Sequence, residues 1–337
     1  RISSQGSYYA QLLHGFCCAF QPVTMATQPA ADYPFYIVDA FTKRLRRGNP
    51  AAVVLLTPEP LLSDSDMQSV AAEFNLSETA FVFLASGSAA PDRPVPLRWF
   101  TPECEVALCG HATLAAATAV HLHLRASGRD CDRLEFDTMS GLLPVTRDAA
   151  TGQWSLDFPL GTVEPIAMGD RDASAALLES ALGDELGVNS VLSLAHSPDR
   201  QKLLIELKPE ARDQFLRLRP DTAAMVAAAP TGQRIRGVIV TVSGEGFRER
   251  DGDDSGEFDF LSRYFAPWVG IPEDPVTGAA HTVLAAYWRA KLGGRDEMLA
   301  KQCSRRGGVL RLRVDAGRGR VALTGHSVMS AHGRVAI

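Results

Sequence analysis

Several features are missing from this chain of 337 residues. It has no run of about 18 uncharged apolar residues, so no transmembrane helix is expected. It has no excess of positive charge: 34 Lys+Arg stand against 39 Asp+Glu, a net charge of −5, which gives no electrostatic reason to bind nucleic acid or a membrane surface. Its six cysteines form no C-x-x-C pair and no regular spacing, unlike a disulfide framework or a zinc site. These absences predict a soluble, cytoplasmic protein with reduced thiols.

Cofactor-binding signatures are also missing. The sequence has no G-x-G-x-x-G after a strand, no Walker A motif, no G-x-S-x-G and no H-E-x-x-H. The eight histidines are scattered, and His121 and His123 alternate rather than share one helix face. No nucleotide, metal or flavin is therefore indicated. What remains is cofactor-free acid/base chemistry on a small molecule.

The length predicts two domains, at roughly 150 residues each. The chain begins at Arg1, and its first methionine is Met25. Residues 1–32 are interpreted as a non-native or disordered leader, because they lack clear caps and sustained periodicity. The domains are placed at 33–165 and 166–337, with the junction expected near 166–187, a stretch that mixes Asp, Ala and Gly.

The local patterns predict an α+β fold with more strands than helices in the first half. Ser63 supplies an N-cap, acidic residues follow it, and Asn75 closes the far end of a helix over Asp64–Phe74. An Ala-rich helix is expected from about Thr113 to Leu124. Apolar segments and a Gly-Asn-Pro turn predict an early β-ribbon: strand Phe35–Phe41, turn Gly48–Pro50 and strand Ala51–Leu56.

The two halves of the chain resemble each other at a nearly fixed offset. The segment Arg98–Pro102 recurs as Arg263–Pro267, 165 residues later, and the same offset carries Cys109 onto Asp274. Gly152 in G-x-W-x-L matches Gly319 in G-x-V-x-L at an offset of 167. The repeats predict two pseudo-symmetric domains with a ligand cleft between them.

In each half a loop leads into the start of a small-residue helix, at Cys109–Thr113 and at Asp274–Ala279. Unpaired N–H groups and the helix dipole make such ends anion sites, so two of them at one cleft would grip a carboxylate. Tight loops capped by small residues are the simpler interpretation of either one alone. Two loops at matched positions, each with a protonatable residue, favour the site.

Four side chains are candidates for proton transfer. Partial burial would raise the pKa of Glu78 and suit it to proton shuttling, although a lone acid is often a cap or an ion pair. Asp274 precedes a proline, which turn chemistry explains equally well. His111 is a hydrogen-bond donor to substrate or a satisfied core group. Cys109 is either a thiol with a lowered pKa at a helix N-terminus or an inert small hydrophobe.

Five motifs in this order resemble the phenazine biosynthesis PhzF-like family: GNPAAVVLL, AAEFNLSETAF, RWFTPECEVALCGHATLAAA, EDPVTGAAH and QCSRRGG. The resemblance runs from about Tyr33 to Ile337. It implies the fold of diaminopimelate epimerase, with two pseudo-symmetric α+β domains, each a β-barrel-like sheet around a central helix. It also implies a cofactor-independent isomerase, acting on a small carboxylate-bearing substrate, and a homodimer.

The resemblance assigns roles motif by motif. It implies Glu78 as the acid/base residue, with Asp274 and the Gly110–His111 pair at the substrate or at the second proton position. Asn49, Ser77 and Gly278 are implied substrate contacts. Many members of the family read T-G-S-A where this chain has Thr277-Gly278-Ala279-Ala280, so a serine hydroxyl contact is missing at Ala279. The substrate is therefore left open.

Two other functions remain open. Cys109 is the only thiol in either loop, which excludes a racemase with two thiols but allows an epimerase that pairs Cys109 with Asp274 or with Glu78. A module that binds a small molecule or a protein without turnover is the second alternative. Retention of Glu78, His111 and Asp274 together favours chemistry.

Overall fold

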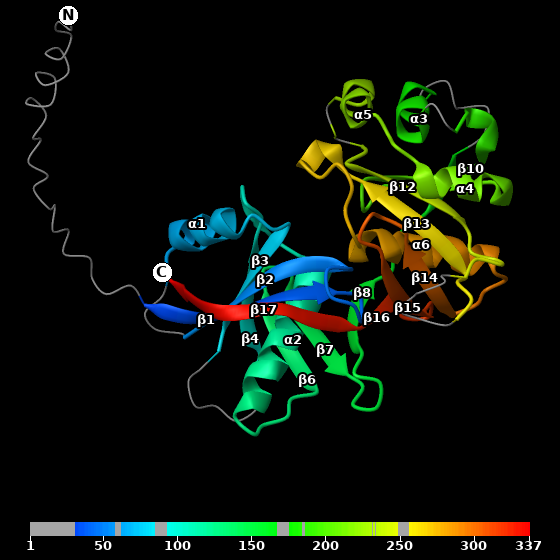
Figure 1. The fold of residues 1–337 in the computed structure, drawn as a ribbon. Coiled ribbons are helices and arrows are strands. Elements are labelled where there is room, and N and C mark those ends of the chain that lie inside the picture. Colours follow the sequence, from blue (N-terminus) through cyan, green and yellow to red (C-terminus); the bar gives the residue numbers. More distant parts are fainter. Residues whose placement is uncertain are drawn as a thin grey trace, which may run out of the picture.

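The computed structural model describes residues 31–57, 62–84, 93–166, 175–183, 186–230, 232, 234–248 and 256–337. The predicted leader, residues 1–32, falls almost wholly outside this part. Two lobes lie side by side (Figure 1). The first contains α1 (Asp64–Phe74), α2 (Gly110–Ala126) and the strands β1 (Asp32–Ala40), β2 (Asn49–Leu56), β3 (Glu78–Phe83), β4 (Val95–Phe100), β5 (Glu105–Val106), β6 (Arg133–Thr138), β7 (Gly141–Arg147) and β8 (Trp154–Pro159).

The second lobe follows the same plan with two added α-helices. Its helices are α3 (Ala175–Leu182), α4 (Arg212–Arg217), α5 (Thr222–Ala228) and α6 (Gly278–Lys291), with short 3-10 turns η2 (Val188–Ser190), η3 (Pro209–Ala211) and η4 (Pro267–Val269). Its strands are β9 (Glu164–Ile166), β10 (Val191–Ser197), β11 (Lys202–Leu207), β12 (Gly237–Ser243), β13 (Phe260–Phe265), β14 (Glu297–Gln302), β15 (Gly308–Asp315) and β16 (Arg320–Gly325). The last strand, β17 (Ser327–Ala336), returns to the first lobe and pairs with β1.

The pairing pattern is duplicated. In the first lobe β2 runs parallel to β3 across α1, and β4 runs parallel to β6 across α2. In the second, β11 runs parallel to β12 across α4 and α5, and β13 runs parallel to β14 across α6. The turn glycines Gly152 and Gly319 occupy matching positions with φ of 73° and 63°. Strands β8 and β16 then pair antiparallel, which joins the two lobes into one hydrogen-bonded sheet.

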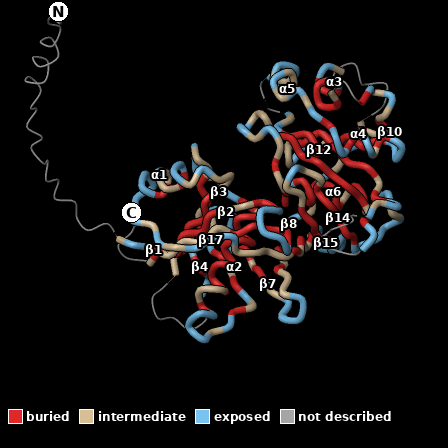
Figure 2. The backbone as a smooth tube through the Cα atoms, viewed as in Figure 1, coloured by how far each residue is buried: buried red, intermediate tan, exposed pale blue. Residues whose placement is uncertain are grey.

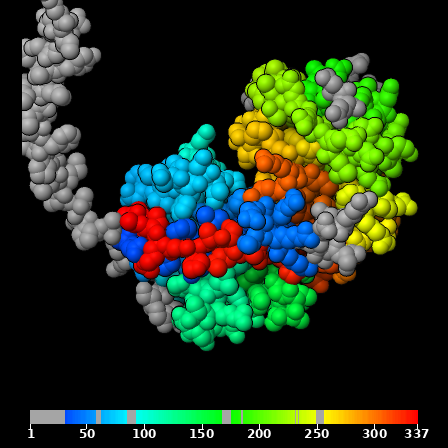
Figure 3. Space-filling model, viewed as in Figure 1, coloured from blue at the N-terminus to red at the C-terminus, as the bar shows by residue number. Residues whose placement is uncertain are grey.

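Each lobe surrounds a buried helix. Helix α2 packs against β1, β2, β3, β8 and β17, and its small residues are buried on almost every side because strands lie all around it. Figure 2 shows these central segments as buried, while α1 is largely exposed. Helix α6 holds the equivalent place in the second lobe, against β15 and β16. The surface between the lobes is hollowed between α1 and the gold segment that contains η4 (Figure 3).

The helix over Asp64–Phe74 has the predicted bounds. Ser63 forms a capping box with Asp66, and Asn75 ends the helix with φ of 48°. Helix α2 begins at Gly110 rather than near Thr113, and neither Cys109 nor any acidic residue marks its start. Because no capping side chain marks this helix start, the prediction from the sequence placed it three residues too late.

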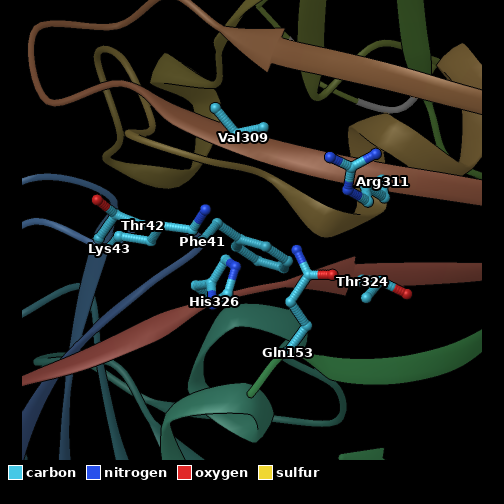
Figure 4. Close-up of a pocket in the computed structure, with 8 residues that line it drawn as sticks. All are labelled: Phe41, Thr42, Lys43, Gln153, Val309, Arg311, Thr324 and His326. Atoms are coloured by element: carbon cyan, nitrogen blue, oxygen red, sulfur yellow. The ribbon is translucent and has the colours of Figure 1, made fainter. Parts of the chain in front are cut away.

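Phe41 leaves the strand that was predicted to include it. Its φ is 63°, which is rare for a bulky residue, and it is fully buried at the junction of the lobes. Its carbonyl accepts from Val309 N, at 3.0 Å, in the second lobe. Figure 4 shows its ring between His326 and Gln153. Contacts from both lobes hold this backbone in the left-handed region.

Candidate active site

The first turns of α2 and α6 meet where the lobes join. A Cβ atom added to Gly110 would lie 3.8 Å from the Cα atom of Gly278, so the two helix starts are in contact. Neither N-cap side chain, of Cys109 or Thr277, caps its helix, so first-turn N–H groups of both helices have no side-chain acceptor at the N-cap. Two positive helix ends therefore converge on one place.

The helix starts correct the register of the internal repeat. Gly110 and Gly278 are 168 residues apart, whereas the offset of 165 carried Cys109 onto Asp274. Cys109 is structurally matched by Thr277, and Asp274 lies three residues earlier. The reason is that the loop between β13 and α6 is three residues longer than the loop between β4 and α2. Both Cys109 and Asp274 nevertheless reach the same cluster.

His111 is the centre of the cluster. It is only 5% exposed, and its Nε2 atom lies 3.1 Å from Oε2 of Glu78. Its Nδ1 atom lies 3.4 Å from the Cys109 sulfur and 3.2 Å from Nδ2 of Asn49. Ser77 Oγ is 3.4 Å from Nε2. The structure thus brings together the predicted residues of three separate segments of the chain.

The two N–H groups of Asn49 determine the donor and acceptor roles in this hydrogen-bond network. Its amide donates to Asp274 Oδ1 at 2.8 Å and to the carbonyl of Val276 at 2.9 Å, which uses both of its N–H groups. Nδ1 of His111 is therefore free to carry a proton of its own toward Cys109. Burial by itself lowers the pKa of His111, but the charge of Glu78 and the hydrogen bond with Cys109 outweigh it and raise that pKa well above its usual value. The imidazole is accordingly protonated.

The carboxyl group of Glu78 is buried, but one of its oxygen atoms accepts no hydrogen bond from the described residues. Its side chain is 12% exposed, and Oε2 has no directed hydrogen-bond donor among the described residues, although it lies at ion-pair distance from His111. Burial raises the pKa of Glu78, yet the charge of His111, helped by the nearby polar groups of Ser77 and Cys109, outweighs it and lowers the pKa overall. The expectation of a raised pKa was wrong, because it omitted the cation 33 residues away.

The pKa of Asp274 is shifted in the opposite direction to that of Glu78. It is 7% exposed, and burial together with the charge of Glu78 raises its pKa to about 6, against the opposing effects of His111, Thr277 and Asn49. Its Oδ1 atom accepts from Asn49 and its Oδ2 atom from the hydroxyl of Thr277. Two carboxyl groups in one cluster are therefore driven apart in pKa, an arrangement typical of acid/base pairs.

Cys109 is buried, and the pKa of its thiol is raised by burial and by the charge of Glu78, so the thiol keeps its proton. The predicted lowering of this pKa by a helix N-terminus is therefore overridden. Ligand atoms of Glu78, Cys109 and His111 all lie within 4.8 Å of one another, as a metal site requires. However, His111 faces Cys109 with Nδ1 and Glu78 with Nε2, on opposite edges of its ring, so one ion does not fit all three in this arrangement.

Ala279, the predicted contact that departs from the T-G-S-A pattern, lies exposed on the first turn of α6, beside the buried Gly278. No interaction of its side chain brings it to the His111 cluster within the part of the chain that the structure describes.

Two positioning residues were missed in the sequence. Gln302 donates to the carbonyl of Asp274 at 2.6 Å and accepts from Thr277 N at 2.9 Å, while the Thr277 hydroxyl binds the Asp274 carboxylate. Gln302 is fully buried at the end of β14. Its place at the head of the QCSRRGG motif was the available signal.

A buried cation next to this loop was missed as well. Lys202 on β11 donates to the hydroxyl of Tyr264 at 2.8 Å, and the carbonyl of Tyr264 accepts from Asp274 N at 3.0 Å. Burial lowers the pKa of Lys202 to about 8. A lysine at the start of an otherwise apolar strand carries no sequence signal of this kind.

Comparison with known proteins decides the family. Residues 38–333 match the family model described as phenazine biosynthesis-like protein, PhzC-PhzF. The chain belongs to this family. A phenazine biosynthesis-like domain-containing protein 1 of Mus musculus is 45% identical over 305 residues, covering 89% of this chain and 98% of the mouse protein. An uncharacterized isomerase of Pseudomonas aeruginosa is 42% identical over 305 residues, with 89% and 97% covered.

Solved structures agree with this PhzF-like fold. A PhzF family protein of Enterococcus faecalis superposes with a TM-score of 0.73 at 35% identity, covering 91% of this chain and all of the other. A hydroxyproline epimerase from Agrobacterium vitis shares the fold, with a TM-score of 0.50 at 13% identity over 91% and 93% of the two chains. The family and its isomerase relatives make this chain an enzyme of the isomerase class.

In the described residues no helix is long and apolar enough to cross a membrane.

Proposed function

We propose that this PhzF-like protein is a cofactor-independent isomerase that moves a proton between atoms of a small carboxylate-bearing substrate. The observation that carries the proposal is the Oε2 atom of Glu78. It is buried, it belongs to a carboxylate held ionised by His111 at 3.1 Å, and none of the described residues directs a hydrogen-bond donor at it. A buried oxygen with a free lone pair is the feature that a general base requires.

The remaining groups fit the other half of a proton transfer. Glu78 takes a proton from a substrate carbon, and the charge left on the substrate is stabilised by protonated His111 and by the two helix starts at Gly110 and Gly278. The proton is returned at a second position by Glu78 or by Asp274, whose pKa of about 6 leaves it partly protonated near neutral pH. Asn49 and Gln302 hold Asp274 in place from two sides.

An epimerase that pairs Glu78 with Cys109 is not favoured by the distances. Two bases on opposite faces of one carbon, each about 3 to 3.5 Å from it, stand roughly 6 to 7 Å apart. The oxygen and sulfur atoms of these residues lie within 4.8 Å of each other. We therefore assign the thiol of Cys109 to the support of His111.

Solvent-deuterium exchange tests the assignment. Wild-type protein is incubated in D₂O with a panel of small carboxylic acids, and deuterium incorporation is followed by NMR. Glu78→Gln keeps the shape of the side chain but removes the base, so exchange into any substrate found should fall about 10²–10⁴-fold. Cys109→Ala should cost little, and Glu103→Gln, an exposed glutamate in the same lobe, should cost nothing.

Three outcomes would contradict the proposal. Wild-type exchange in Glu78→Gln would remove the glutamate from the chemistry. Loss of exchange in Cys109→Ala, with Glu78→Gln active, would favour an epimerase that pairs Cys109 with Asp274. No wild-type exchange with any acid that binds would favour a binding module.

A further inference from the structure

A second hollow lies on the other side of the loop that carries Asp274. Its volume is about 630 Å³, within the range of roughly 300–1,000 Å³ for small-molecule sites. Four segments of the second lobe line it: the end of α4 with the residues that follow, strand β13, the loop before α6, and the loop between β14 and β15. It shares none of its lining residues with the His111 cluster.

Four arginines surround this hollow in a chain whose net charge is −5. Among them, the guanidinium group of Arg263 already has hydrogen-bond partners. It binds both carboxylate oxygens of Glu273, at 2.7 and 3.0 Å, and donates to the carbonyls of Phe215 and Leu218. Glu273 is the only carboxylate among the lining residues, and Arg263 balances its charge.

The other three guanidinium groups have no partner among the residues that the structure describes. Arg217, Arg219 and Arg305 are exposed, and within the described residues none of their side chains makes a hydrogen bond, an ion pair or a ring contact. Arg217 is the last residue of α4 and Arg219 follows two residues later, whereas Arg305 lies in the loop between β14 and β15. Because Arg263 and Glu273 balance each other, the lining residues of the hollow carry a net charge of about +3.

The frame around these arginines is fixed. Arg263 ties the end of α4 to the loop before Asp274, and Ser304 donates to the carbonyl of Pro275 at 2.8 Å. The hydroxyl of Ser304 also accepts from Gly307 N, which shapes the loop that presents Arg305. Hydrogen bonds therefore fix the backbone segments from which the three arginines project.

We propose that this arginine pocket, lined by Arg217, Arg219 and Arg305, binds a small organic phosphate. Guanidinium groups pair with phosphate oxygens two at a time, and they lose little hydration in doing so. A phosphorylated metabolite supplies about two negative charges in one group, together with a body large enough to occupy the hollow. A monocarboxylate supplies one charge and leaves two of the arginines unpaired.

Calorimetric titration of the full chain tests the proposal, with pyrophosphate as the inorganic probe and ribose 5-phosphate as the organic one. Saturable binding is expected, and it should weaken at least about tenfold in Arg217→Gln/Arg219→Gln/Arg305→Gln. It should also weaken as salt rises, because the arginines are exposed. Arg318→Gln, which removes an exposed arginine from the turn between β15 and β16, should bind both probes as the wild type does.

Thermal unfolding separates a binding role from a structural one. The three guanidinium groups make no hydrogen bond or ion pair with the described residues, so the triple variant should melt at or slightly above the wild-type temperature without ligand. Arg305→Gln alone provides a second variant if the triple one unfolds. The proposal fails if the wild type shows no saturable binding up to about 10 mM of either probe, or if the variants bind them as tightly as the wild type.

Discussion

At the scale of single residues, the site depends on charges that come from distant parts of the chain. The S-E-T, G-H and E-D-P motifs indicated Glu78, His111 and Asp274. In the structure His111 contacts Glu78, and Asn49 contacts both His111 and Asp274. The motifs did not reveal the direction of the pKa shifts. That direction depends on which charges become neighbours after folding, and a sequence pattern does not contain this information.

The raised pKa of Asp274 leads to a prediction about stability and pH. Its pKa is about 6 in the folded protein and ordinarily 3.8, so between these values the folded state binds more protons than the unfolded one. Stability due to this group is therefore lost as pH rises from about 4 to 6. Asp274→Asn removes the dependence, and the variant should gain about 3 kcal/mol relative to the wild type across this window.

Denaturant unfolding at several pH values between 4 and 7 measures this difference. Both proteins contain Glu78 and His111, so the difference between the two curves reports the aspartate together with its coupling to these two groups. A difference that stays constant from pH 4 to 7 would show that Asp274 ionises normally in the folded state.

At the scale of elements, local signals succeeded where a helix carries its own caps. The bounds of α1 follow from Ser63 and Asn75, which act within a few residues of the helix ends. The start of α2 was missed because it is fixed by packing against another helix start, not by a cap. Phe41 was missed for the same reason, since its left-handed backbone is imposed by the second lobe.

The capping box of α1 gives a prediction at this scale. Ser63→Ala removes the acceptor for Asp66 N and one partner of the box, so the protein should lose about 1 kcal/mol of unfolding free energy. Ser63→Asp should restore most of it, because an aspartate oxygen also accepts from the first turn. Chemical denaturation checks both variants. No loss in Ser63→Ala would mean that the cap contributes nothing, and an equal loss in both variants would mean that an aspartate oxygen does not replace the serine.

At the scale of the whole molecule, Phe41 holds the two lobes together. A Cβ atom added to Gly325 in β16 would lie 2.6 Å from Cδ1 of Phe41, closer than packing allows. Gly325→Ala should therefore destabilise the protein by about 1–3 kcal/mol, because the buried ring must shift.

Gly187→Ala is the matched control, since nothing lies within 4 Å of a Cβ atom at that position. Thermal unfolding of the two variants side by side measures the difference. Equal melting temperatures would show that the ring of Phe41 moves freely and does not lock the junction.

The pairing of β17 with β1 has a consequence for how the protein is made. The first lobe begins at Asp32, but the strand that covers its edge and contacts α2 consists of Ser327–Ala336. During synthesis the ribosome therefore makes the whole second lobe before the first lobe receives its last strand. The two paired strands are separated in sequence by that entire lobe, and contacts between such distant residues are slow to form. Until β17 has left the ribosome, β1 carries an open sheet edge, and the cell must protect it from pairing with other chains.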